Sequence, residues 1–140
     1  MTPAEMAAAL TGRLDGPHSD EDTSAVAELA AEAVRFLNYA TGPHAAAGLT
    51  YPATAYAVTG SLGRAAALLG QCFGQVTDFL DYELAARRLG GDSGCDPVLP
   101  VERTRRHLEC ATRAAATVHD ALAAAQSDLA GLHQHTERRA

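Results

Sequence analysis

The chain has 140 residues and a formal net charge of −6 at pH 7, with 31 alanines, 11 arginines and no lysine. Alanine is the strongest helix former, so this composition favours a single all-α domain and gives β-structure little support. The negative charge disfavours sequence-independent binding to nucleic acid, which needs a cationic surface. The absence of lysine beside so much alanine and arginine is typical of a GC-rich genome, and we expect an actinobacterial source.

The start of the chain lacks the charged and apolar segments of a secretory signal, and its three cysteines are an odd number. We therefore predict a cytoplasmic protein with free thiols. No stretch approaches the ~18 uninterrupted apolar residues that a membrane-spanning helix needs. We expect no membrane partner.

Residues 1–18 are predicted to form a short helix over 3–14, opened by Pro3 at the first helical position, and a linker. A second helix is expected to begin after Ser19, where a capping hydroxyl and three acidic residues suit a helix N-terminus. Its apolar residues recur at helical spacing and predict a buried stripe. They are Val26, Leu29, Ala33, Phe36, Leu37 and Ala40.

An irregular segment over 41–52 leads into a central helix, predicted over residues 53–89. Large apolar side chains recur along it at three-four spacing and predict a core-facing stripe, with a second apolar stripe beside it. The first stripe is Leu62, Leu69, Phe73, Val76, Leu80 and Leu84, and the second is Leu68, Cys72, Phe79 and Tyr82. The width of the two stripes together predicts two helical neighbours.

Four glycines lie within this helix, each costing about 1 kcal/mol relative to alanine. Close packing is one explanation, because Gly70 and Gly74 lie one turn apart and would let a partner backbone approach. The alternative is a break, in which Gly60 to Gly63 ends a first short helix. We expect the central helix to end at a left-handed cap formed by Gly90 and Gly91.

A turn-rich link over 90–100 precedes the last helix, which is predicted to start at Pro100. Its apolar residues keep a heptad spacing over more than four repeats, which indicates a closely spaced antiparallel partner. These positions are Val101, Thr104, Leu108, Ala111, Ala115, Val118, Leu122, Ala125, Leu129 and Leu132.

The predicted fold is all-α: an up-down antiparallel helical bundle of three long helices plus a short N-terminal helix, similar in layout to a four-helix bundle. The bundle is assigned to residues 19–136 and a C-terminal tail to 137–140. The surplus apolar stripe of the central helix predicts a homodimer in which two hairpins complete a four-helix core. The residues assigned to this dimer contact or to close helix packing are Gly70, Gly74, Phe73 and Phe79.

Antiparallel order places the end of the central helix and the start of the last at one pole. This lower pole is rich in arginine and is a candidate site for nucleic acid or another anion. Its arginines are Arg87, Arg88, Arg103, Arg105 and Arg106. The alternative is that the acidic start of the second helix neutralises them, or that they are solvated.

The opposite, upper pole gathers three of the four tyrosines, with a histidine in the intervening loop. Amphipathic rings beside a glycine-bearing loop suit a surface that binds a partner or a small ligand. The candidate residues are Tyr39, His44, Tyr51 and Tyr56. The alternative is that the tyrosines only cap the core.

No catalytic motif is present, and the chain has neither a phosphate-binding loop nor paired metal-ligand spacing. A zinc site can be drawn from Cys95, Asp96, His107 and Cys110, but without a C-x-x-C pair it is not predicted. We expect no cofactor. The sequence favours a non-enzymatic protein that acts through contacts with itself or an unidentified protein; the alternative is a small regulatory protein that contacts nucleic acid or another anion through the arginine-rich pole.

Overall fold

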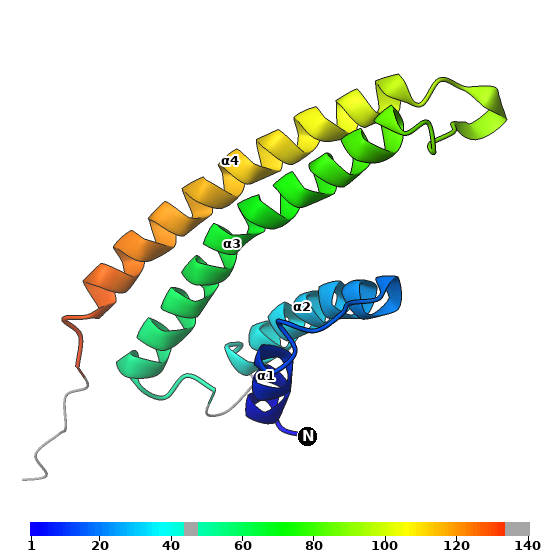
Figure 1. The fold of residues 1–140 in the computed structure, drawn as a ribbon. Coiled ribbons are helices and arrows are strands. Elements are labelled where there is room, and N and C mark those ends of the chain that lie inside the picture. The colour runs from blue at the N-terminus through cyan, green and yellow to red at the C-terminus, as the bar shows by residue number, and fades with distance from the viewer. Residues whose placement is uncertain (44–47, 134–140) are drawn as a thin grey trace, which may run out of the picture. The chain divides into compact units, whose positions relative to one another are not determined.

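The computed structural model describes residues 1–43 and 48–133, and these are helical apart from caps, turns and links (Figure 1). The chain divides into two compact units, Met1–Gly48 and Leu49–Ala140. The predicted all-α class is confirmed, and four α-helices with a closely packed pair are consistent with a small helical bundle. The place of the second helix in that bundle concerns both units and stays a prediction.

The first unit begins with α1, Pro3–Thr11. A capping box starts the helix: the backbone N–H of Glu5 donates to Thr2 Oγ1 at 3.2 Å, and the Glu5 carboxylate accepts from the Thr2 backbone N–H. That backbone hydrogen bond, followed by the hydroxyl bond, lowers the pKa of Glu5. The helix ends three residues before the predicted residue 14, because Gly12 occupies the C-cap.

The second helix, α2, spans Asp20–Ala40 and is capped as predicted, with Ser19 Oγ accepting from the Asp22 N–H at 3.0 Å. None of its residues is buried, although burial of an apolar stripe was predicted. Phe36, in the middle of that stripe, remains exposed. Leu29 and Leu37 of the same stripe are half-buried, so this face of α2 is not closed into a core.

The second unit is a hairpin of two long antiparallel helices, α3 (Pro52–Ala85) and α4 (Val98–Leu129), which pack along their length (Figure 1). A short 3₁₀ turn, η1 (Asp92–Gly94), lies in the link between them. The predicted hairpin is confirmed. Because α3 continues without interruption through Gly60 and Gly63, the alternative of a helix break at these glycines is wrong.

Small residues form the seam at which α3 meets α4. A Cβ at Gly63 would lie 3.5 Å from Leu122 Cβ, and one at Gly70 would lie 3.2 Å from Thr112 Cγ2. Gly63 is buried, and so is Ala66, which lies between the two glycines. The seam follows the heptad spacing Gly63, Ala66, Gly70, Phe73, Thr77, Leu80 and Leu84.

Three residues of the predicted core-facing stripe, Leu62, Leu69 and Val76, lie one position away from this seam, about 100° around the helix. Leu69 and Val76 are exposed in the hairpin, so α4 does not cover them. The physical reason is that residues without bulky side chains let the two backbones approach most closely. From Gly63 to Gly70 the seam therefore consists of small residues, and Leu62 and Leu69 beside it are turned away from α4.

The same offset occurs on α4. Its buried residues are Val101 and Ala115, and its seam continues through Leu108, Leu122 and Leu129, all of which were predicted. The intervening seam positions are Arg105, Thr112, His119 and Gln126, each one residue beyond the predicted Thr104, Ala111, Val118 and Ala125. The prediction was therefore correct at every second position and displaced by one residue at the others.

The end of α3 has a Schellman geometry centred on Arg87, which adopts φ 57°. The Arg88 N–H donates to the Glu83 carbonyl at 3.0 Å and the Arg87 N–H donates to the Leu84 carbonyl at 3.1 Å. The predicted cap at Gly90 and Gly91 is wrong, because the helix ends at Ala85 and the left-handed residue is an arginine. Glycine is favoured at such a position but is not required.

The start of α4 also differs from the prediction by two residues. Asp96 Oδ1 accepts from the Val98 N–H at 3.0 Å and satisfies one of the free donors of the first turn. Pro100 then occupies the third helical position, where its missing N–H is not needed.

Candidate interaction surface

One flank of the α3–α4 seam carries no charged side chain over most of its length. On α3 it is a single heptad stripe of apolar residues. On α4 the residues on the same side are small apolar ones. This surface, called here the uncharged face, consists of Val58, Leu62, Ala65, Leu69, Cys72, Val76 and Phe79 of α3 and Ala111, Ala114, Val118, Ala121 and Ala125 of α4.

The uncharged face is open to solvent within the hairpin. The exposed fractions are 44% for Leu69, 43% for Val76, 59% for Phe79 and 49% for Val118. Among the described residues, the buried apolar ones are Ala66, Val101 and Ala115. The hairpin thus buries mostly small residues and leaves the large apolar residues of the uncharged face exposed, which is unusual for a monomer and typical of an interaction surface.

The opposite flank of the same seam has the reverse character. On α3 it carries both charged residues of the stretch from Val58 to Phe79, namely Arg64 and Asp78. On α4 it carries Glu102, Arg106, Glu109, Arg113 and Asp120. We call it the charged face. Because the two faces belong to the same two helices, the contrast between them cannot come from overall composition.

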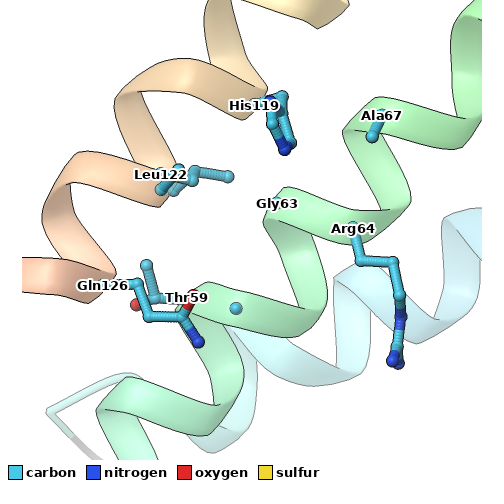
Figure 2. A pocket seen from close by; sticks show the side chains of 9 residues that line it. Thr59, Gly63, Arg64, Ala67, His119, Leu122 and Gln126 are labelled. Carbon is cyan, nitrogen blue, oxygen red and sulfur yellow. The ribbon is translucent and has the colours of Figure 1, made fainter. Parts of the chain in front are cut away.

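A shallow groove of about 240 Å³ lies on the charged face, where glycines leave the seam unfilled (Figure 2). Its lining consists of Thr59, Gly60, Gly63, Arg64, Ala67, His119, Leu122, Ala123 and Gln126. Figure 2 shows the guanidinium of Arg64 directed away from the groove. Gln126 Nε2 donates to the Tyr56 carbonyl at 3.4 Å, which holds the amide across Gly60.

His119 lines this groove and is half-buried. Its Nδ1 lies 3.1 Å from Oδ1 of the neighbouring Asp120. The polar groups of the groove are therefore an imidazole, an amide and a hydroxyl around an open, glycine-floored hollow.

The arginine-rich lower pole is partly neutralised within the hairpin. The Arg88 guanidinium donates to both Glu83 carboxylate oxygens, at 2.7 and 2.8 Å, and lies 5.0 Å from the Tyr82 ring centroid. Arg105 pairs with Asp81 across the seam. The alternative to an anion site invoked the acids of the second helix, but these two arginines are neutralised by carboxylates of α3.

The remaining arginines of this pole, Arg87, Arg103 and Arg106, are exposed. The sequence around them is not cationic, since the stretch from Asp78 to Cys110 holds seven carboxylates and five arginines. A nucleic-acid site needs an excess of positive charge. The charge balance of this pole therefore weighs against nucleic-acid binding.

The predicted upper-pole residues are distributed over both units. Tyr39 lies in α2 and is 71% exposed, whereas Tyr51 directly precedes α3 and Tyr56 lies near its start. His44 lies outside the described residues. Because the tyrosines belong to different units, their clustering stays a prediction.

The four residues predicted for dimer contact or close helix packing occupy three different surroundings. Gly70 and Phe73 lie on the seam with α4. A Cβ at Gly74 would meet no atom within 4 Å, on the side of the charged face. Phe79 lies exposed at the end of the uncharged face. The other residues of the uncharged face were not assigned to an interface from the sequence. The lack of charged residues at these heptad-spaced positions is the signal that would have identified them.

The three cysteines are free and exposed. Within residues 1–43 and 48–133, no three His, Cys, Asp or Glu side chains come close enough together to hold a metal ion. In the same part of the chain, no helix combines the length and the apolar character that crossing a membrane requires.

Comparisons with protein families, with curated proteins and with solved structures find no match to this chain.

Proposed function

We propose that this protein acts through protein–protein contacts as a homodimer, and that the uncharged face is its interface. The observation that carries the proposal is the contrast between the two faces of one hairpin: large exposed apolar residues without any charge on one flank, and alternating charges on the other. Exposed apolar surface is costly in water, at about 25 cal/mol per Å². The uncharged face is therefore the part of the hairpin that gains most from being covered.

A second copy of the hairpin has the right dimensions to cover it. The 22 residues from Val58 to Phe79 extend about 32 Å at a 1.5 Å rise per residue. With two helices about 10 Å apart, the face is about 20 Å wide, or about 600 Å² in each copy. Two such faces bury about 1,200 Å², at the lower end of stable protein–protein interfaces. A second hairpin covers the full width of the face, whereas a single additional helix would leave part of it open.

Two alanine substitutions on α4 test the proposal with a matched control. Ala114 lies on the uncharged face and Ala116 on the charged face, and both are exposed in the hairpin. Replacing either residue by glutamate changes helix propensity and net charge equally. In the homodimer, Ala114→Glu buries a carboxylate without a partner, whereas Ala116→Glu leaves it in water.

The measurement is the mass in solution by light scattering after size exclusion. We expect a dimer for the wild-type chain and for Ala116→Glu, and a monomer or a more than tenfold weaker dimer for Ala114→Glu. Equal masses for the two variants would contradict the proposed interface. A monomeric wild-type chain at high concentration would contradict the homodimer and would assign the uncharged face to the chain's own helix over 20–40 or to another protein.

The alternative function, contact with nucleic acid or another anion through the arginine-rich pole, has less support. Two of its five arginines are paired with carboxylates of α3, and carboxylates outnumber arginines around it. Any remaining affinity for nucleic acid or another anion would depend on Arg87, Arg103 and Arg106, despite the excess of carboxylates around them.

A further inference from the structure

We infer that the two copies associate so that α3 of each packs on α4 of the other, with both α3–α4 links at the same end of a four-helix core. This inference rests on the proposed homodimer and specifies its geometry. It follows from the distribution of large and small side chains over the uncharged face.

The observed seam sets which residues of α3 and α4 lie at the same height in the hairpin. Gly63 lies beside Leu122 and Gly70 beside Thr112, so residue numbers at one height add up to about 183. On the uncharged face this relation places Leu69 level with Ala114. Taken along the face, the level pairs are Val58 with Ala125, Leu62 with Ala121, Ala65 with Val118, Leu69 with Ala114 and Cys72 with Ala111.

Four of these five pairs are complementary in size. Where α3 has a large residue, such as Leu62 or Leu69, α4 has an alanine at the same height. Where α3 has its own alanine, Ala65, α4 has its largest residue of this face, Val118. A large residue packed against a small one fills space at the density of a protein core without voids or overlap.

Two facing hairpins can be related by a two-fold axis in only two ways that align their helices. If the axis runs along the helices, each α3 faces the other copy's α4 at the same height, and the size-matched pairs recur across the interface. If the axis runs across the helices, α3 faces α3 in reverse order. With the axis near Leu69, at the middle of the face where the overlap is greatest, Leu62 meets Val76 and Ala65 meets Cys72, so that on α3 large residues oppose large ones and small residues oppose small ones.

With the same axis, the second arrangement would hold the α3 pair apart and leave a void where the two Ala114 side chains meet in the α4 pair. A void of methyl size is destabilising, because the atoms around it lose packing contacts. In the first arrangement only Cys72 and Ala111 set small against small, and the other level pairs match a large residue with a small one. Neighbouring helices are antiparallel in both arrangements, as in up-down bundles, so the size match alone distinguishes them. Packing therefore favours the axis along the helices.

Cysteine cross-linking tests the geometry. The background is a chain in which Cys72, Cys95 and Cys110 are replaced by serine, and single cysteines are introduced as Leu69→Cys in one preparation and Ala114→Cys in another. We expect a covalent dimer under mild oxidation only when the two preparations are mixed and allowed to exchange. Leu69→Cys mixed with Ala116→Cys, on the charged face, should give none.

A covalent dimer from Leu69→Cys alone would overturn the inference and support the axis across the helices. Absence of any covalent dimer from proteins that light scattering shows to be dimeric would also overturn the geometry while leaving the homodimer intact. A monomer in light scattering would overturn both proposals together. If Leu69→Cys weakens association, Ala65→Cys and Val118→Cys, which lie at one height, are used instead. A covalent dimer is again expected only when the two preparations are mixed.

Discussion

Replacing Gly74 by alanine should stabilise the protein and leave its association unchanged. A glycine inside a helix costs about 1 kcal/mol relative to alanine, because its backbone loses more freedom on folding. A Cβ added at Gly74 would meet no atom within 4 Å, so nothing in the hairpin offsets this gain. We expect Gly74→Ala to raise the free energy of unfolding by about 1 kcal/mol.

Gly70 provides the matched control, because it lies one turn earlier in the same helix and has the same intrinsic cost. Its added Cβ would lie 3.2 Å from Thr112 Cγ2, tighter than an ordinary contact. The threonine methyl or the helix backbone would have to shift, which offsets part of the gain. Gly70→Ala should therefore stabilise the protein less than Gly74→Ala does, or destabilise it.

Urea unfolding followed by circular dichroism, at one fixed protein concentration, measures both effects as shifts of the midpoint at constant slope. Light scattering on the same samples reports association. If Gly74→Ala gained no stability and also lost the dimer, Gly74 would face a partner backbone. The interface would then lie on the charged face, and the reasoning from the uncharged face would be refuted.

Three further predictions concern the end of α3 and the interface. Arg87→Gly should be about 1 kcal/mol more stable than Arg87→Ala in urea unfolding, because both lose the charge but only glycine relieves the φ of 57°; equal stabilities would contradict this. The hydrogen bonds from Arg88 lower the pKa of Glu83 from its usual value of 4.5. The stabilisation that they provide is fully present above pH 4.5 and is lost as the pH falls through the lowered pKa. The free energy of unfolding should thus fall more between neutral and acidic pH in the wild-type chain than in Glu83→Gln, and parallel profiles would exclude a contribution from the pair. Finally, because no charge lies in the proposed interface, the dimer dissociation constant from analytical ultracentrifugation should not weaken as sodium chloride rises from about 0.05 to about 1 M, and steep weakening would point to the arginine-rich pole.

Sequence periodicity was sufficient to predict the long helices and the α3–α4 hairpin, because each helix repeats its apolar residues over many turns. It was not sufficient to predict which stripe faces the partner helix. On α3 the stripe through Leu69 and the seam through Gly70 have the same spacing, and a ranking by hydrophobicity selects the larger residues. The close approach of the two backbones is a property of the pair of helices, and one helix considered alone does not reveal it.

The end of α3 illustrates a second limit of the sequence. Two consecutive glycines predicted the left-handed position at Gly90 and Gly91, yet Arg87 adopts it. The strain at Arg87 is accompanied by favourable contacts of the next residue, since Arg88 binds the Glu83 carboxylate and lies over Tyr82. These contacts form only when α3 ends at Ala85. The propensity of glycine to end helices therefore favours an end at Gly90 and Gly91, whereas the contacts of Arg88 favour the observed end at Ala85.

The seam and the uncharged face follow from the same property of α3. Its glycines and alanines allow α4 to approach closely, and the helical period then places Leu62, Leu69, Val76 and Phe79 about 100° away from the seam. A hairpin built in this way buries little large apolar surface of its own, so most of the hydrophobic stabilisation available to it lies at the uncharged face. If a second copy covers that face, folding and association are coupled, and the stability of the protein should rise with its concentration.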